Sequence, residues 1–143
     1  MSDPYDLQRF VEAQEAVYGG VVTELGQGRK RSHWMWFIFP QIAGLGFSAM
    51  AQRYAIASRA EAVAYLAHDV LGLRLFECTR LVLAITGKPI REILGSPDDM
   101  KFHSSMTLFG EASGDAIFGE SIVKYYRGKK DQATLDRLAQ LGH

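Results

Sequence analysis

Residues 33–41 have the sequence HWMWFIFPQ, which contains both tryptophans of the chain and an apolar run bounded by a histidine and a glutamine. Helical periodicity is lost within this run and the proline stops any helical turn, so we expect a short, buried helical piece. Aromatic side chains bury large areas, which makes Trp34 and Trp36 candidate core anchors. The alternative is a ligand site. If His33 and Gln41 are buried they need hydrogen-bond partners, and a planar ligand ring lying against Trp36 would supply them.

Length and composition are those of one ordinary domain. The chain has 143 residues, of which 48% are hydrophobic, so a single core can be buried and we expect one globular domain over residues 1–143. The 16 basic and 16 acidic residues cancel. This balance removes the electric field with which a nucleic-acid binder attracts phosphates, so we expect no nucleic-acid partner.

The start of the chain and its cysteine content indicate the compartment. Residues 1–6 have neither the basic start nor the apolar run of a secretory signal, and the longest apolar stretch, residues 34–39, is too short to cross a bilayer. Cys78 has no second cysteine with which to form an internal disulfide. We therefore expect a cytoplasmic protein without membrane contact, and the sequence leaves monomer and homodimer both open.

Helix signals recur along the whole chain, and convincing strand signals are missing. Spacings of three and four residues between apolar side chains predict a helix from about residue 4 to about residue 26, weakened at Gly19-Gly20. Ser58 and Glu61 form a capping box that begins another helix. Further helices are predicted over residues 48–56, 69–86, 96–109, 113–126 and 131–141. Ser96 is the predicted cap of the helix over residues 96–109. The predicted fold class is all-α, a compact single-domain bundle of about six to eight short amphipathic helices with irregular connections.

A second segment, residues 98–109, combines a polar strip with an apolar one on the same predicted helix. Its candidate ligand-binding residues are Asp98, Lys101, Ser104, Ser105 and Thr107. The ammonium and hydroxyl groups could hold an anion or a sugar hydroxyl, while the carboxylate accepts from a ligand hydroxyl. In the structural alternative, Asp98 caps the helix and pairs with Lys101, and the hydroxyls bond carbonyls one turn back. The sequence favours neither interpretation.

Familiar catalytic and metal-binding motifs are missing from the sequence. The four histidines, His33, His68, His103 and His143, form neither an HExxH pattern nor a close pair, so we expect no protein-built metal site and no resident cofactor. The serines lie outside any G-x-S-x-G elbow, and the glycine-rich residues 26–30 lack the spacing of a P-loop. The sequence therefore leaves any catalytic residue unknown, although the basic run at residues 29–31 could meet a ligand phosphate.

Four strings of residues together resemble a known family. They are residues 33–41, Gly44-Leu45-Gly46-x-Ser48, Glu61-Ala62 with Tyr65-Leu66, and Asp98-x-x-Lys101 with residues 104–109. This pattern is similar to a bacterial family catalogued as domain of unknown function number 1810, and it covers nearly the whole chain. The resemblance implies a compact all-α domain without an established activity. The family pattern also includes Gln14, Tyr18, Lys30 and Arg74, which makes Gln14 a further candidate for a ligand pocket.

Two other family labels have less support from the sequence. Members of the family are sometimes called calpastatin, but a calpastatin-type inhibitor is a disordered, repeated, polar chain, whereas this chain is apolar enough to fold and has no repeat. A fainter similarity links residues 83–87 and Asp98 to the NADAR group of helical proteins, which act on or bind ADP-ribose and related N-glycosides. The acidic-aromatic motif and the tryptophan-glycine ending of that group are missing here.

Three functions follow as hypotheses from these patterns. The first is a small-molecule binder that takes a nucleotide- or sugar-like ligand in a cleft between residues 33–41 and residues 98–109. The second is a hydrolase or N-glycosidase acting on an ADP-ribose-like substrate, with Asp98 or His33 as acid or base. The third is a protein-protein interaction module or homodimer that docks through the aromatic segment. The first requires the two segments to be in contact.

Overall fold

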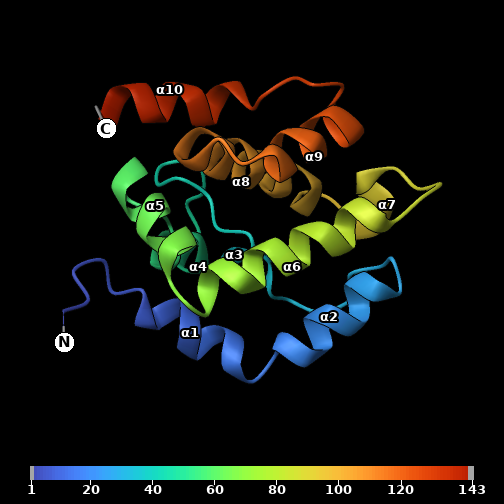
Figure 1. Ribbon diagram of the computed structural model, residues 1–143, viewed down its shortest axis with the longest axis horizontal. Helices are drawn as coiled ribbons and strands as arrows, with labels where there is room; N and C mark the ends of the chain where they lie inside the picture. Colours follow the sequence, from blue (N-terminus) through green and yellow to red (C-terminus); the bar gives the residue numbers. More distant parts are fainter. Residues whose placement is uncertain (1, 142–143) are drawn as a thin grey trace.

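The apolar spacing along the chain is expressed as helices throughout the computed structural model, which describes residues 2–141. The helices are α1 (Gln8–Glu15), α2 (Tyr18–Gly26), α3 (Met35–Ile38), α4 (Ala49–Arg53), α5 (Arg59–Ala67), α6 (Leu71–Ala84), α7 (Ile90–Leu94), α8 (Asp98–Ser113), α9 (Ala116–Tyr126) and α10 (Gln132–Leu141) (Figure 1). Among these residues, extended pairing is limited to an isolated parallel bridge between Ile42 and Ile56. The predicted all-α fold class is confirmed. None of the described helices has the length and apolar character that crossing a membrane requires.

Residues 2–141 form ten helices, somewhat more than the about six to eight predicted. Short pieces account for part of the difference, because α3, α4 and α7 contain only four or five residues each. The predicted N-terminal helix is also divided. Its break falls at Ala16 and Val17 rather than at Gly19-Gly20, which lie inside α2. The turn lets α1 pack on α3 while α2 packs on α6, so each half finds its own apolar partner.

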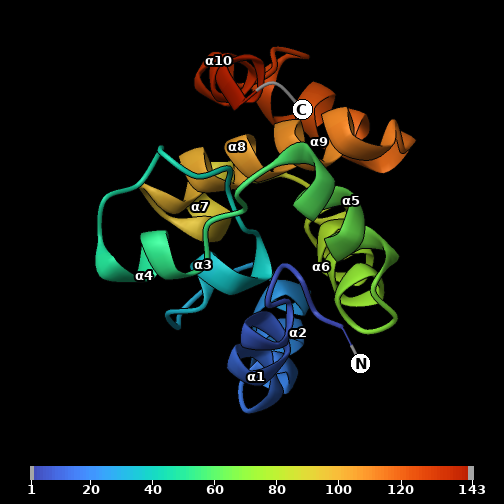
Figure 2. The same cartoon turned by 90° about the vertical axis from the view of Figure 1, so that its left-hand side faces the viewer.

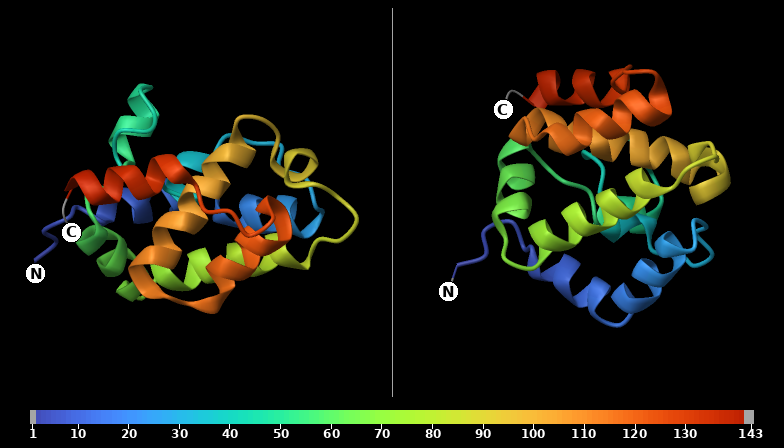
Figure 3. Two further views of the ribbon diagram at one scale, coloured as in Figure 1. Left: turned by 90° about the horizontal axis from the view of Figure 1, so that it is seen from above. Right: turned by 45° about the vertical axis from the view of Figure 1, so that its right-hand side comes forward.

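Two long helices organise the layers of the molecule. Helix α8 contacts α5, α7, α9 and α10, whereas α6 contacts α2, α3, α5 and α9. In Figure 1 this arrangement places α10 at the top, α1 and α2 at the bottom, and the two long helices between them. Helix α4 and its flanking loops lie to one side of this stack (Figure 2) and project from it when the molecule is seen from above (Figure 3).

Aromatic rings from distant parts of the sequence make up much of the core. Phe39 at the end of the tryptophan segment meets Phe102 of α8 edge to face, with ring centroids 4.9 Å apart. Tyr65 of α5 lies 5.1 Å from the ring of Phe10 and 5.3 Å from that of Phe109. Such pairs are worth about 0.5–1.5 kcal/mol beyond their burial. The Phe39–Phe102 pair joins the tryptophan segment directly to α8.

The capping box at α5 forms with one change. Ser58 Oγ accepts a hydrogen bond from the Glu61 amide at 3.1 Å, as predicted. The Glu61 carboxylate accepts from the amide of Ala57 at 3.0 Å, one residue before the cap, where a standard box would use the cap's own N–H. Its other oxygen pairs with Arg9 at 2.9 Å, so this carboxylate also ties α5 to α1.

Helix α8 begins differently from the prediction that Ser96 caps it. The residue before the helix is Pro97, after a cis Ser96-Pro97 peptide bond, and no side chain caps the first turn. Instead, the Asp99 amide donates to the Gly95 carbonyl at 2.9 Å. The acids Asp98 and Asp99 stand in the first turn, where they complement the positive end of the helix dipole.

Candidate functional site

The first tryptophan of the segment is a core residue. The Trp34 side chain is buried, and its Nε1–H donates to Glu24 Oε1 of α2 at 3.0 Å. The same carboxylate accepts from the amides of Arg31 and Ser32 at 2.7 and 3.0 Å, and from Ser32 Oγ at 2.6 Å. Glu24 therefore holds the loop that leads into α3, and the sequence alone did not point to this partner.

We predict that the stability of the protein in acid depends on the ionisation of Glu24. Burial, the largest single influence, disfavours its charged form, but the hydrogen bonds from Ser32, Arg31 and Trp34 outweigh burial and lower the pKa of Glu24 from 4.5 to about 2. A carboxyl whose pKa is lower in the folded protein stabilises it above pH 4.5, and this contribution is lost as the pH falls from 4.5 toward 2. We expect Glu24→Gln to lower the free energy of unfolding by about 2 kcal/mol at neutral pH.

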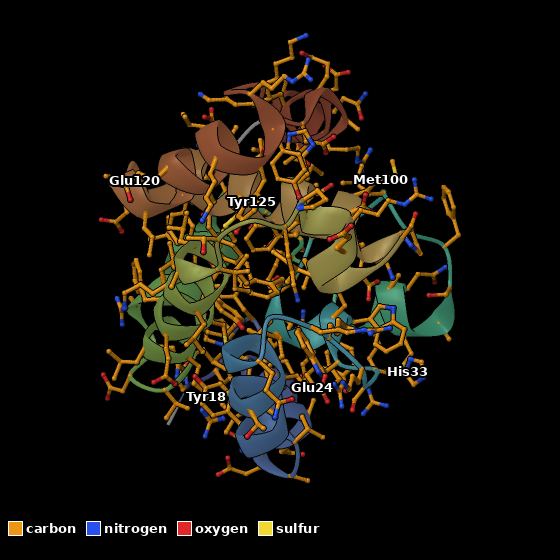
Figure 4. The ribbon with its side chains drawn as sticks, turned by 90° about the vertical axis from the view of Figure 1, so that its right-hand side faces the viewer. Tyr18, Glu24, His33, Met100, Glu120 and Tyr125 are labelled. Carbon is orange, nitrogen blue, oxygen red and sulfur yellow. The ribbon has the colours of Figure 1, made fainter. Side chains whose placement is uncertain are left out.

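The measurement is urea unfolding of the wild type, Glu24→Gln and Glu120→Gln at neutral pH and near pH 3. Glu120 is an exposed acid of α9, well separated from Glu24 in Figure 4, and serves as the charge-matched control. The deficit of Glu24→Gln should shrink at the lower pH, whereas the control should stay close to the wild type at both. An equal deficit for the two variants would refute the assigned role.

The second tryptophan joins the two candidate segments. Trp36 is half-buried, and the Lys101 ammonium of α8 lies over its ring, 5.1 Å from the centroid. Lys101 Nζ is also 3.7 Å from Asp98 Oδ1, while Asp98 Oδ2 is 2.9 Å from Lys30 Nζ. Cation-π contact and ion pairing together hold the ammonium in place. Because the ammonium occupies this face of the indole, a ligand ring cannot stack there.

An open hollow of about 370 Å³ lies beside this ammonium. We call it the α8 hollow; it is lined by Gln41, Leu45, Gly46, Pro97, Met100, Lys101, His103, Ser104, Asp131 and Ala133. Its walls are the loop after α3, the first turns of α8 and the start of α10. Three positions named from the sequence, Gln41, Lys101 and Ser104, thus line the same space. The Gln41 side chain makes no hydrogen bond within residues 2–141.

A glycine and an arginine hold the loop that forms one wall. Gly44 has a φ of 99°, a conformation that favours glycine, and a Cβ atom there would lie 2.5 Å from Arg137 Nε of α10. The guanidinium donates from Nε to the Ala43 carbonyl at 2.9 Å. The wall is therefore fixed by a contact between residues 94 positions apart.

The hydroxyl groups of α8 are already bonded or enclosed. Ser104 Oγ donates to Asp131 Oδ2 at 2.9 Å and also lies 3.2 Å from the Met100 carbonyl. Thr107 Oγ1 donates to the His103 carbonyl at 3.0 Å and accepts from the Asp131 amide at 2.9 Å. Both hydroxyls therefore attach the start of α10 to α8. Each also bonds a carbonyl one turn back, as the structural alternative describes. This leaves Lys101 as the cation of the segment that faces the hollow.

Ser105 and Asp98 are placed away from a ligand. The Ser105 side chain is buried, and its Oγ has no hydrogen-bond partner among residues 2–141. It is not among the residues that line the α8 hollow. Asp98 does not cap α8; its carboxylate lies between the ammonium groups of Lys30 and Lys101 and pairs with both.

Gln14 and His33 are not brought to the α8 hollow. The Gln14 side chain is buried, donates from Nε2 to the Phe37 carbonyl at 2.7 Å and to Tyr65 Oη at 3.1 Å, and accepts from Arg74 at 3.3 Å. Its hydrogen-bonding capacity is used inside the core. His33 is exposed and well separated from Met100 of the hollow in Figure 4. The expectation that both bind one ligand together with Lys101 finds no geometric support.

The residues of the hollow that were missed as ligand candidates include Leu45, His103 and Asp131. Leu45 belongs to one of the strings that carried the family resemblance, which was the available signal. The His103 ring stacks on Tyr126 with centroids 3.9 Å apart, and its Nε2 lies 2.6 Å from the Lys129 carbonyl. That nitrogen must carry the proton, because a carbonyl oxygen can only accept.

Metal ligands do not gather in the part of the chain that is described. Within residues 2–141, no three side chains of His, Cys, Asp or Glu lie close enough to hold an ion together. His143, the last of the four histidines, lies outside the described residues.

Comparison with known proteins places the chain in a family. A family model described as "Protein of unknown function (DUF1810)" matches residues 4–138. The 1.38 Å crystal structure of the conserved hypothetical protein Rv1873 from Mycobacterium tuberculosis is similar to this chain, with a TM-score of 0.95 and 56% sequence identity over 96% of this chain and 99% of that chain. No curated protein matches the chain. The resemblance read from the four strings is confirmed, and the chain belongs to the DUF1810 family of proteins of unknown function.

Proposed function

We propose that this protein binds a small nucleotide- or sugar-like ligand in the α8 hollow. The observation that carries the proposal is the meeting of a positioned ammonium, Lys101, with an unbonded amide, Gln41, on one open hollow. The volume of about 370 Å³ lies within the range of small-molecule sites. An anionic or hydroxyl group of the ligand would contact the ammonium, and the amide would donate to or accept from the edge of its ring.

Apolar groups supply a further part of the hollow's lining. Leu45, Pro97 and Met100 line it together with the polar pair. Met100 is 67% exposed. Covering it with a ligand's apolar face would remove that surface from water, at roughly 25 cal/mol per Å². A ligand with one apolar face and one charged or hydroxylated edge therefore fits better than a purely polar one.

Binding is tested by thermal shift and calorimetry with ADP-ribose, NAD and adenosine as probes. We expect at least one probe to raise the melting temperature of the wild type. Lys101→Met keeps the apolar stem over Trp36 but removes the charge, and it should weaken binding by about tenfold. Arg80→Met, at an exposed position of α6 outside the hollow, is the control and should bind like the wild type. If no probe binds, or if Lys101→Met binds like the control, the assignment of this hollow is wrong.

The enzymatic alternative has its own support, because His103 and Asp131 both line the α8 hollow. The Asp131 carboxylate already accepts from Ser104 Oγ and from the amide and hydroxyl of Thr134. It therefore serves first as the cap of α10. The same samples answer the question by chromatography of the probes after incubation: product formed from NAD or ADP-ribose by the wild type, and not by His103→Asn, would favour a hydrolase or N-glycosidase.

The interaction-module alternative requires an exposed aromatic segment. Trp34, Phe37 and Phe39 are buried in the core of the same chain, and the exposed face of Trp36 is shared with Lys101. An aromatic segment that already packs inside its own domain offers little area for docking a partner or a second copy.

A further inference from the structure

A second hollow, of about 480 Å³, lies on a different set of residues and goes beyond the proposed function. We call it the basic hollow; it is lined by Arg29, Lys30, Lys88, Arg91, Glu92, Ile93 and Gly95. Four cations and one acid meet there in a chain whose total charge is zero. Three separate segments supply them: the loop after α2, the connection between α6 and α7, and α7 itself.

Main-chain and side-chain contacts hold these segments together. The Lys30 amide donates to the Ile93 carbonyl at 2.7 Å. The Lys88 ammonium donates to the Gly28 carbonyl at 3.1 Å, and Gly28 has a φ of 77°. A Cβ atom at Gly28 would lie 3.4 Å from Lys88 Nζ, so the glycine admits the lysine at close range. The cations are thus gathered by the fold and are not scattered along one exposed loop.

The charges of this cluster are unequally satisfied. Lys30 is paired with Asp98 at 2.9 Å, so the carboxylate largely compensates its charge. Arg29 and Arg91 are exposed and make no side-chain hydrogen bond or ion pair within residues 2–141. Like charges held near one another repel, and an anion bound between them relieves that repulsion. Guanidinium groups are also the side chains best shaped to contact phosphate oxygens in pairs.

We propose that the basic hollow binds a compact polyanion of the polyphosphate class, with Arg29 and Arg91 as the principal contacts and Lys88 as a third cation. A single small anion such as sulfate would be too weakly held at an open surface, because salt screens each contact. A chain of linked phosphates presents several charges within a small volume and can engage the three cations at once. The hollow is small, and the rest of the protein carries a net negative charge, which disfavours an extended basic track of the kind that nucleic acids follow.

The α8 hollow is a separate site in this proposal. The residues 95–97 separate the two, since Gly95 lines the basic hollow and Pro97 lines the other. Asp98 lies between their lysines, Lys30 and Lys101, and holds both. The two proposals nevertheless rely on different cations, Lys101 in one and the two arginines with Lys88 in the other, so each can fail independently.

The experiment is calorimetric titration with inorganic tripolyphosphate, with sulfate as the single-anion comparison at equal ionic strength. We expect tripolyphosphate to bind the wild type and sulfate to bind at least about tenfold more weakly. Arg29→Gln with Arg91→Gln should weaken tripolyphosphate binding by about tenfold or more, with an unchanged melting temperature, because neither side chain makes a contact that the fold needs. Arg80→Gln with Arg127→Gln removes two exposed charges outside both hollows, serves as the charge-matched control and should bind normally.

Three results would overturn the proposal. The first is no tripolyphosphate binding to the wild type at about physiological ionic strength. The second is an equal loss in the Arg29/Arg91 variant and in the Arg80/Arg127 variant, which would indicate attraction to net charge alone. The third is tighter binding of a single- or double-stranded oligonucleotide than of tripolyphosphate, which would make the basic hollow part of a nucleic-acid surface instead.

Discussion

Arg9→Ala is expected to lower the free energy of unfolding by about 4 kcal/mol, because it leaves a buried carboxylate without its partner. The Arg9 guanidinium pairs with Glu61 Oε2 at 2.9 Å, and the Glu61 side chain is only 3% exposed. The nitrogen of this ion pair, Nη2, also donates to the Ala55 carbonyl at 2.8 Å. Nε and Nη1 donate to the main-chain carbonyls of Arg53, Tyr5 and Asp6 at 2.5–2.9 Å. One side chain therefore joins the start of α1 to α5 and to the strand-like residues before it.

Thermal and urea unfolding measure this effect. A loss of about 4 kcal/mol corresponds to a fall in melting temperature of roughly 10–15 °C for a domain of this size. Arg80→Ala is the matched control, since Arg80 is exposed on α6 and makes no side-chain hydrogen bond within residues 2–141. Adding Glu61→Gln to Arg9→Ala removes the stranded charge and should restore part of the loss. If Arg9→Ala fell no further than the control, the contacts of this guanidinium would contribute nothing net.

Gly72→Ala is the second substitution with a large expected effect. Gly72 is buried in the first turn of α6, and a Cβ atom there would lie 2.1 Å from the Leu66 carbonyl oxygen of α5 and 3.0 Å from its carbon. The obstacle is backbone, which cannot rotate away as a side chain can, so the two helices must separate. We expect a loss of about 3 kcal/mol in unfolding free energy, or roughly 10 °C in melting temperature.

Gly119→Ala makes the same chemical change with the opposite expected sign. Gly119 lies inside α9, is exposed, and has no atom within 4 Å of the position that a Cβ would occupy. Alanine favours a helix interior over glycine by about 0.5–1 kcal/mol, so this variant should melt slightly above the wild type. A Gly72→Ala protein as stable as Gly119→Ala would show that α5 and α6 do not approach as closely as described.

Helix positions were largely predictable because helical signals are local. Apolar spacing over one or two turns and the Ser58 cap depend on neighbours within about four residues, and both are read directly from the sequence. The errors occurred where local signals were overruled. The break before α2 comes at Ala16 and Val17, ahead of the glycines, because α1 and α2 pack on different partners. Helix α8 lacks its expected serine cap because the carbonyl of Gly95 accepts the Asp99 amide.

The candidate site was predictable only in part. Juxtaposition of the tryptophan segment with residues 98–109 was predicted, and Lys101 does lie over Trp36. Whether the polar residues proposed beside them remain free to bind a ligand depends on contacts that sequence spacing does not reveal. Ser104 bonds Asp131, a residue 27 positions away, and Gln14 bonds Phe37 and Tyr65 inside the core. A polar side chain offers the same donors and acceptors whether or not the fold has already used them.

By itself the sequence determined the all-α class, most helix positions, the family and the burial of the aromatic run, because each depends on side-chain type and on spacing within a few residues. Which polar groups remain free to bind a ligand depends on how the helices pack, and this is seen only in the folded structure. Docking of distant helices consumed Glu24, Gln14 and the α8 hydroxyls in hydrogen bonds, and left Gln41 and Lys101 facing one open space. The physical reason is that a hydrogen bond requires a partner within about 3 Å, and for these groups that partner comes from another part of the chain.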